Sequence, residues 1–385
     1  MESTSRTGAL MAFIIGVAVV LGVAEVALRL FSPFPIFEKS GHTLAHPVLL
    51  KTVDPSFPEI DRDGFRNPDP PARPELVTLG DSMTYGYNVG SAQSWPQQLG
   101  RMAGVSVYNF GIGGYGPLHY SWLLDKALEK KPRVVLLGIH LPNDLNDVCK
   151  MFGIVYWKDW ADRRGIDVEA CVRRAGGVTT APNVEVQGPT LGQRLKLAVR
   201  RTALGSAVGT LVVDPLNYAL SRKAEPGTVV FRDGRNDTYI SKAFNVFTAG
   251  NSDPAAEWMQ IAAPLTEALF VEMAGRARTQ GVDFGIVFIP SKQSVFQTYL
   301  EEAGQTLPPE FLTVVEQEAA LEGRFAKVLD GAGIAWANAR PALVSLLREQ
   351  REVYPFRDDD HPLAPGYEAI ARVAFERFFA RTEGR

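Results

Sequence analysis

The sequence predicts an α/β fold in which a five-stranded parallel sheet lies between two layers of helices. Five short apolar runs, each bounded by turn residues, alternate with stretches that have helical periodicity. Several runs are rich in Val and Ile, which is typical of strands buried on both faces. Alternation of strands and helices indicates a parallel sheet. The 385 residues are 46% apolar and 22% charged, a composition that supports a large folded core.

The apolar runs give the expected strands in chain order: Leu76–Leu79, Val105–Phe110, Arg133–Ile139, Asp283–Ile289 and Ile334–Asn338. Helical patterns lie at about 94–103, 117–131, 256–280, 310–331, 341–350 and 364–381. Parallel sheets of this kind bind ligands beyond the carboxyl ends of their strands. The residues that directly follow each strand are therefore the candidates for chemistry.

Three regions follow from these patterns. Residues 1–31 form an apolar N-terminal segment, and the Pro-rich residues 32–74 are expected to be a linker leading into the folded part. Residues 75–384 form the α/β domain. Within it, residues 150–255 are a long insertion between the third and fourth strands, in which only Gln193–Leu204 has a helical pattern. Long loops in compact domains are usually functional or disordered, and a lid is one interpretation of this one.

The N-terminal segment predicts an uncleaved membrane anchor. Gly8–Ala24 has seventeen residues without a charge, and as a helix it would span roughly 25 Å. The span extends to Phe31 if Glu25 and Arg29 are tolerated near the interface. A cleaved signal peptide is the first alternative, although no A-x-A site follows the apolar run. A buried core helix is the second. We expect the folded domain on the extracytoplasmic side, although the flanking charges do not decide orientation.

Charge and cysteine content exclude some function classes. The net charge is −3 and no basic stripe is present, so nucleic acid is not an expected partner. Cys149 and Cys171 have no CxxC spacing and no neighbouring His cluster, which excludes a typical zinc site. If the domain lies outside the cytosol they could form one disulfide, and two unpaired thiols are the equal alternative. The sequence gives no indication of oligomeric state.

Ser82 is a candidate nucleophile because it follows the first strand directly, in the segment Gly80-Asp81-Ser82. A serine at the carboxyl end of a buried strand can present its hydroxyl group and its backbone N–H to a substrate. The residue two positions later is Thr84, so this is not the G-x-S-x-G elbow of α/β-hydrolases. The structural alternative is a serine that caps the following helix.

Three further groups follow other elements. After the second strand, the glycine-rich run Asn109–Gly116 can bring a backbone N–H close to a ligand, or it is a plain turn. After the third strand, Asn143 has a side-chain amide that can donate to an oxyanion, or it is an ordinary turn residue. Before the last helix, Asp358 precedes His361 by three residues, and a His base needs a carboxylate partner. The alternative there is a solvated acidic loop.

Taken together, these four blocks resemble those of the SGNH hydrolase superfamily, also called the GDSL esterases and lipases. The resemblance covers roughly residues 74–384, apart from the insertion. It implies a flavodoxin-like fold, the catalytic residues Ser82, Asp358 and His361, and an oxyanion hole made by Ser82, Gly114 and Asn143. It implies no metal and no cofactor. Asp359 is the second choice for the carboxylate, because three Asp residues adjoin His361.

Two positions depart from the family pattern, and one further segment has a second likeness. Gly113 stands where the family usually has Ser, and the glycine expected just before Asn143 lies five residues upstream, at Gly138. The segment Ile289–Lys292 resembles a Pro-x-Lys segment of SGNH proteins in bacterial exopolysaccharide systems, including alginate O-acetylation proteins. The alternative is a lysine at a strand end that is solvated or caps a carboxylate.

The expected function is that of a membrane-anchored serine esterase acting on an acyl ester, with acetyl groups on a cell-envelope or exported glycan as the candidate substrate. An O-acyltransferase is the first alternative, because both enzymes form the same acyl-enzyme. A catalytically silent glycan-binding protein is the second. A structural partner in an envelope assembly, with residues 150–255 as its contact surface, is the third.

Overall fold

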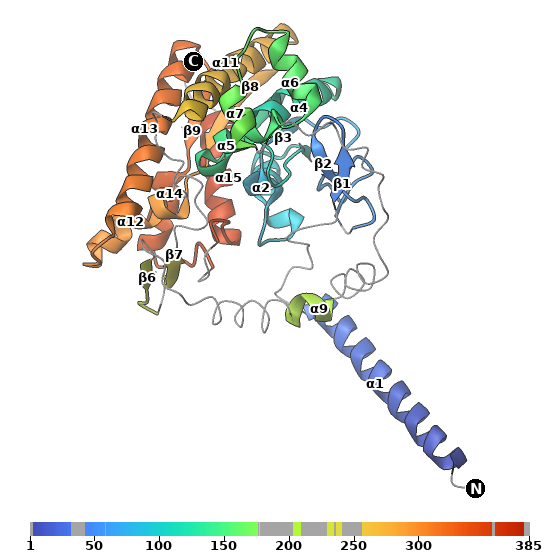
Figure 1. Cartoon of the computed structure of the whole chain (residues 1–385). Helices are drawn as coiled ribbons and strands as arrows, with labels where there is room; N and C mark the ends of the chain where they lie inside the picture. The colour runs from blue at the N-terminus through green and yellow to red at the C-terminus, as the bar shows by residue number, and fades with distance from the viewer. Residues whose placement is uncertain are drawn as a thin grey trace. The chain divides into compact units, whose positions relative to one another are not determined.

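The computed structural model describes residues 3–31, 43–57, 59–175, 177, 203–208, 229–234, 236–240, 256–355 and 359–380. The chain divides into two compact units (Figure 1). The first unit comprises residues 1–40 and 187–223, and the second comprises residues 41–186 and 224–385. The sheet and all candidate site residues belong to the second unit.

The predicted five-stranded parallel sheet is confirmed. Its strands lie in the order β4-β3-β5-β8-β9, and every neighbouring pair is parallel (Figure 1). Counted along the chain, this is the order 2-1-3-4-5 of flavodoxin-like folds. The strands are β3 (Leu76–Leu79), β4 (Val107–Asn109), β5 (Val134–Ile139), β8 (Asp283–Phe288) and β9 (Ala335–Asn338).

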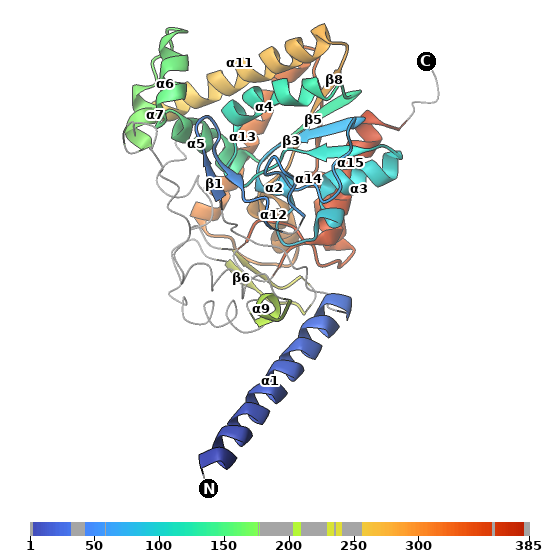
Figure 2. The same ribbon diagram turned by 90° about the vertical axis from the view of Figure 1, so that its right-hand side faces the viewer.

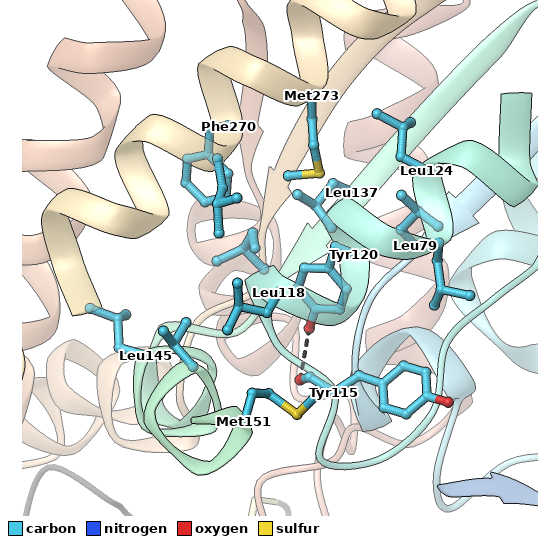
Figure 3. Close-up of a cluster of buried hydrophobic side chains, with 14 of the residues drawn as sticks. Leu79, Tyr115, Leu118, Tyr120, Leu124, Leu137, Leu145, Met151, Phe270 and Met273 are labelled. Atoms are coloured by element: carbon cyan, nitrogen blue, oxygen red, sulfur yellow. Dashed lines mark hydrogen bonds between the residues drawn. The ribbon is translucent and has the colours of Figure 1, made fainter. Parts of the chain in front are cut away.

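Alternate strand residues point to opposite faces of the sheet, and each face has its own apolar core. Val77 and Leu137 belong to one core, which Figure 3 shows with Phe270 and Met273 packed nearby. Leu76 and Leu136 belong to the other. The first face is covered by α4 (Pro117–Glu129), α5 (Leu141–Met151), α11 (Glu257–Thr279) and most of α13 (Pro309–Gly331). The second is covered by α3 (Trp95–Ala103), α12 (Lys292–Glu302), α14 (Arg340–Arg348) and α15 (Ala364–Phe378) (Figure 2).

The six predicted helices correspond to α3, α4, α11, α13, α14 and α15. The helices α5 and α12, which directly follow β5 and β8, were not predicted. Pro142 lies in the first turn of α5, where a missing N–H costs nothing, yet Pro-Asn in a sequence is typical of a turn. The remaining short elements are α2 (Ser82–Tyr85), η1 (Ser91–Gln93), α6 (Val155–Asp162) and α7 (Glu169–Arg174).

Residues 43–74 differ from the predicted linker, because most of them fold into the second unit. Strands β1 (Thr43–His46) and β2 (Leu50–Val53) form an antiparallel hairpin. The buried Arg66 guanidinium pairs with Glu59 and donates to the backbone carbonyls of Tyr85 and Gly86 next to α2. These contacts hold the segment against the folded unit. They could not be predicted from the sequence, because the Pro-rich segment has neither helical nor strand periodicity.

Only parts of the insertion are described. They include α6, α7, α9 (Ala203–Val208) and a small hairpin of β6 (Val229–Phe231) and β7 (Thr238–Ile240). Of the helical pattern predicted at Gln193–Leu204, residues 193–202 lie outside the described residues. Within the insertion, α7 contributes Val168 and Cys171 at its start to the core that α11 also fills.

The two cysteines form a disulfide that joins α5 to α7, across 22 positions of sequence. Closing a loop of that length restricts the unfolded chain, so we expect the disulfide to contribute about 3 kcal/mol to the free energy of unfolding. The double variant Cys149→Ala/Cys171→Ala should unfold at correspondingly lower urea concentration than the oxidised protein. Reducing agent should destabilise the wild type but leave the variant unchanged. Equal unfolding midpoints for wild type and variant would contradict the expectation.

The N-terminal residues form the long helix α1 (Ser3–Phe31). Its residues Gly8–Leu28 are long and apolar enough to cross a membrane, with a mean hydropathy of 2.5. The carboxylate of Glu25 accepts a hydrogen bond from the backbone N–H of Leu204, at 2.9 Å, within the first unit. An apolar helix at this place is either a signal sequence or an anchor.

Candidate active site

Ser82 begins α2 immediately after β3, and it is not the residue that caps this helix. Asp81 takes that role, because its Oδ1 accepts a hydrogen bond from the Met83 backbone N–H at 2.9 Å. The structural alternative for Ser82 therefore does not hold. Gly80 makes the sharp strand-to-helix connection possible, since a methyl group there would lie 2.9 Å from the carbonyl oxygen of Gly138 and closer still to Thr84. Ser82 remains 7% exposed.

His361 connects Ser82 to a carboxylate. Its Nε2 lies 2.8 Å from Ser82 Oγ, and its Nδ1 lies 2.7 Å from Asp359 Oδ1. Because a carboxylate accepts the hydrogen on Nδ1, Nε2 is left free to accept the Ser82 hydroxyl hydrogen. The His361 and Tyr87 rings also pack in a T-shaped arrangement, with centroids 5.0 Å apart, which restricts rotation of the imidazole.

The carboxylate on His361 is that of Asp359, the second choice of the sequence, whereas Asp358 lies outside the described residues. Oδ1 of Asp359 also accepts the backbone N–H of His361 at 3.0 Å. Its Oδ2 accepts a hydrogen bond from Asn88 Nδ2, which also donates to the His361 carbonyl oxygen. These bonds restrict the position of the Asp359 carboxylate next to His361 Nδ1.

Gly114 and Ser82 both offer backbone donors. Among the described residues, neither of these two N–H groups has a hydrogen-bond partner. Gly114 has φ +80°, a conformation that favours glycine. The loop is held in place by Asn109, whose Oδ1 accepts the Gly111 N–H and whose Nδ2 donates to the Thr84 carbonyl, both at 2.8 Å. Asn109 was not singled out from the sequence, although it opens the glycine block.

Asn143 lies in the first turn of α5 and contacts the nucleophile segment. Its Nδ2 donates to Asp81 Oδ2 at 3.1 Å, and the same oxygen lies 3.3 Å from Ser82 Oγ. An amide nitrogen carries two hydrogens, so the bond to Asp81 leaves one for another acceptor. The structure thus gathers Ser82, Asn143 and Asp81 into one hydrogen-bonded group beside His361.

Buried titratable groups support the loops around this group. Asp144 accepts hydrogen bonds from the Tyr120 hydroxyl and the His140 backbone N–H, both at 2.8 Å. Burial raises the pKa of the Asp144 carboxyl, and the Asp81 charge raises it further. Burial also lowers the pKa of His119 to about 3, so its neutral ring accepts the Gly116 N–H at 3.0 Å. Tyr120 in turn donates to the Tyr115 carbonyl, as Figure 3 shows.

Asp147 gives this region a pH-dependent stability. Burial raises the pKa of its carboxyl to about 7, although Lys150, at 2.5 Å, lowers it. Burial outweighs the ion pair because the Lys150 side chain is 55% exposed and its attraction is screened by water. A folded-state pKa above the unfolded value makes the folded state bind the proton more tightly, so this contribution to stability falls as pH rises from about 4 to 7.

The variant Asp147→Asn should therefore gain stability relative to wild type as pH rises. Urea unfolding at pH 5 and pH 8 measures this: the variant's free energy of unfolding, minus that of wild type, should be more positive at pH 8. The same difference at both pH values would contradict the expectation.

The Pro-x-Lys segment contacts the loop that leads to His361. Lys292 is fully buried, and its Nζ donates to the carbonyl oxygen of Pro355 at 2.9 Å, in the loop that leads to His361. Ser291 caps α12 and donates its N–H to Glu318 at 2.9 Å. The solvated lysine is therefore wrong, because Lys292 is buried and donates to a backbone carbonyl, whereas the carboxylate-capping alternative is not tested by these contacts.

Comparisons with known proteins give structural similarity only. No protein-family model matches the chain, and no curated protein matches its sequence. Similar solved structures include a putative lipolytic protein of the G-D-S-L family from Desulfitobacterium hafniense DCB-2, with 12% identity and a TM-score of 0.36 over 79% of this chain and 98% of that chain. A variant of Axe2, an acetyl xylan esterase from Geobacillus stearothermophilus, has 11% identity and a TM-score of 0.37 over 80% and 96%.

The psychrotrophic esterase EstA from Pseudoalteromonas sp. has 9% identity and a TM-score of 0.35 over 78% of this chain and 94% of that chain. At such identities, similarity concerns the fold and says nothing of activity or substrate. The comparisons give no support to the likeness between the segment Ile289–Lys292 and exopolysaccharide proteins.

Proposed function

We propose that the protein is a serine esterase in which Ser82 is the nucleophile, His361 the general base and Asp359 the carboxylate that orients the imidazole. The observation that carries the proposal is the continuous hydrogen-bonded chain from Asp359 through His361 to Ser82, with links of 2.7 and 2.8 Å. A serine whose hydroxyl faces an oriented imidazole is the arrangement that activates it for attack on a carbonyl.

The first half of the reaction follows from these positions. Ser82 Oγ attacks the ester carbonyl carbon while His361 Nε2 takes its proton. The oxyanion that develops is met by the backbone N–H groups of Ser82 and Gly114 and by the second N–H of Asn143. Each such donor typically lowers the barrier by roughly 3–4 kcal/mol. His361 then protonates the departing alcohol oxygen, which leaves an acyl group on Ser82.

In the second half, water attacks the acyl-enzyme with His361 again as the base. A sugar hydroxyl in place of water would make the protein an O-acyltransferase, since both reactions share the acyl-enzyme. Acetyl groups on a cell-envelope or exported glycan are the substrate we propose, on the basis of the sequence resemblance. A glycan-binding or assembly role without catalysis is less consistent with an oriented Ser-His-Asp chain.

Location follows from two features of the chain. The apolar helix α1 can anchor the protein, and the disulfide between Cys149 and Cys171 requires an oxidising compartment. We therefore propose a single-pass protein whose catalytic unit lies outside the cytoplasm.

The test uses the full-length chain in detergent with 4-nitrophenyl acetate, butyrate and octanoate. We expect release of nitrophenolate, fastest for the acyl length that the site accommodates. Adding an oligosaccharide separates the two reactions: a hydrolase releases free acid, whereas a transferase places the acyl group on the sugar. Absence of nitrophenolate release for all three esters would refute the esterase proposal.

A further inference from the structure

A lysine from outside the sheet lies beside the proposed oxyanion hole. Lys51 belongs to β2, and a methyl group on Gly114 would lie 3.4 Å from its Nζ atom. The Lys51 backbone is tied to the same loop, because its carbonyl oxygen accepts the Tyr115 hydroxyl at 2.7 Å. The β1-β2 hairpin therefore places the ammonium group of Lys51 beside Gly114, whose backbone N–H we propose as an oxyanion donor.

Within the described part of the chain, no acidic group lies within hydrogen-bond distance of this ammonium. Lys51 is half-buried, and among the described residues its Nζ makes no hydrogen bond and no ion pair. Asp147 is the acid whose charge raises the pKa of Lys51, but burial lowers that pKa by more. The Asp147 carboxylate already binds Lys150 at 2.5 Å.

Two guanidinium groups of the second unit show the usual arrangement, in which a partly or fully buried cation has an acidic partner. Arg66 pairs with Glu59 at 2.5 Å, and Arg340 pairs with Glu322 at 2.6 Å. Removing a charge from water without a partner is unfavourable, so a half-buried ammonium beside Gly114, without an acidic partner among the described residues, is best explained by a ligand that supplies the negative charge.

We propose that Lys51 binds an anionic group of the ester, so that the site takes esters carrying a carboxylate or another anion close to the reacting carbonyl. This inference rests on the proposed esterase function. The anion belongs either to the acyl half or to the alcohol half of the ester, and both use the same chemistry at Lys51. A lysine that only strengthened the oxyanion hole would act on every ester alike, which separates the two roles.

The test compares kcat/KM for two matched ester pairs. In the first pair, 4-acetoxybenzoate carries a negative charge on its alcohol half, and 4-acetoxybenzamide is its neutral counterpart. In the second pair, the mono-4-nitrophenyl ester of adipic acid carries the charge on its acyl half, and 4-nitrophenyl hexanoate is the neutral counterpart. In wild type we expect the anionic member to be preferred in one pair, which identifies the half. In Lys51→Met, the anionic-to-neutral ratio for that pair should fall by about 10- to 100-fold, the range for a hydrogen bond to a charged group.

Two variants control the comparison. Lys51→Arg keeps the charge and should keep most of the preference, whereas Lys126→Met removes an exposed lysine of α4 and should leave the ratio unchanged. An unchanged ratio in Lys51→Met would overturn the inference, whether both rates fall together or neither falls. A fall of the same size in Lys126→Met would also overturn it, because the preference would then come from overall charge.

Binding separates this inference from the proposed function. Calorimetry with Ser82→Ala uses both ester pairs. In one pair the anionic member should bind more tightly than the neutral member, and the double variant Ser82→Ala/Lys51→Met should lose that difference. If binding depends on Lys51 while wild type hydrolyses no ester, the esterase proposal fails and the anion site stands. If esters are hydrolysed but binding ignores Lys51, the anion site fails alone.

Discussion

Replacing Ser82 by Ala is expected to lower kcat for nitrophenyl ester hydrolysis by on the order of 10⁴-fold or more, since no acyl-enzyme can form. The side chain loses one oxygen at a site that is 7% exposed, and Asp81 still caps α2, so the fold should be kept. KM should change little, because the lost interaction is made mainly in the transition state. Steady-state kinetics with 4-nitrophenyl acetate measure the effect.

Ser121→Ala is the matched control for this variant. Ser121 is a serine of similar burial on α4, where its Oγ contacts Arg276 instead of His361. Its removal should leave kcat within a few-fold of wild type. Activity of Ser82→Ala within about tenfold of wild type would show that another residue is the nucleophile.

Replacing Asp359 by Asn is expected to lower kcat by roughly 10⁴-fold while leaving the fold intact. An amide at this position can donate to Nδ1 of His361 and so favours the tautomer with hydrogen on Nε2. That tautomer cannot take the proton of Ser82 Oγ. The loss should be visible in kcat at neutral pH with the same nitrophenyl ester.

Asp358→Asn is the neighbouring comparison, and it decides between the two carboxylates that the sequence offers. Because Asp359 Oδ1 lies 2.7 Å from Nδ1 of His361, Asp358→Asn should have a small effect on kcat. A larger loss in Asp358→Asn than in Asp359→Asn would return the role to Asp358.

The sheet and the places of its site residues follow from the sequence because buried parallel strands have strong local signals. The run Leu76–Leu79 was predicted with the bounds that β3 has, and the carboxyl ends of β3 and β5 bring Ser82 and Asn143 near each other. Gly114 lies in the loop after β4, which is the neighbour of β3 in the sheet. The order of the strands is therefore enough to predict where these residues lie.

The choice between Asp358 and Asp359 needs more than topology. Which of two adjacent carboxylates reaches the ring depends on the local backbone and on long-range bonds such as those from Asn88 to Asp359 and to the His361 carbonyl. Residues far apart in sequence make these bonds, so no spacing rule contains them.

The position of Lys51 and the buried contact of Lys292 could not be predicted from the sequence, for a similar reason. The β2 strand has only four residues, and buried and exposed positions do not alternate clearly along it. The sequence around Lys51 therefore shows no strand pattern and was predicted to be a linker. Lys292 is buried against the carbonyl oxygen of Pro355, which is far from it in the sequence. A contact between one side chain and a distant backbone atom produces no periodic pattern from which it could be predicted.

Labelling with a fluorophosphonate tests the central claim, that Ser82 is a nucleophile activated by His361, most directly. After reaction of the full-length protein, peptide mass spectrometry should find one adduct, on the peptide that contains Ser82, in parallel with loss of ester hydrolysis. His361→Ala should be labelled far more slowly, because its serine has no base within 2.8 Å. An adduct on another residue with Ser82 unmodified, while hydrolysis is lost, would contradict the claim.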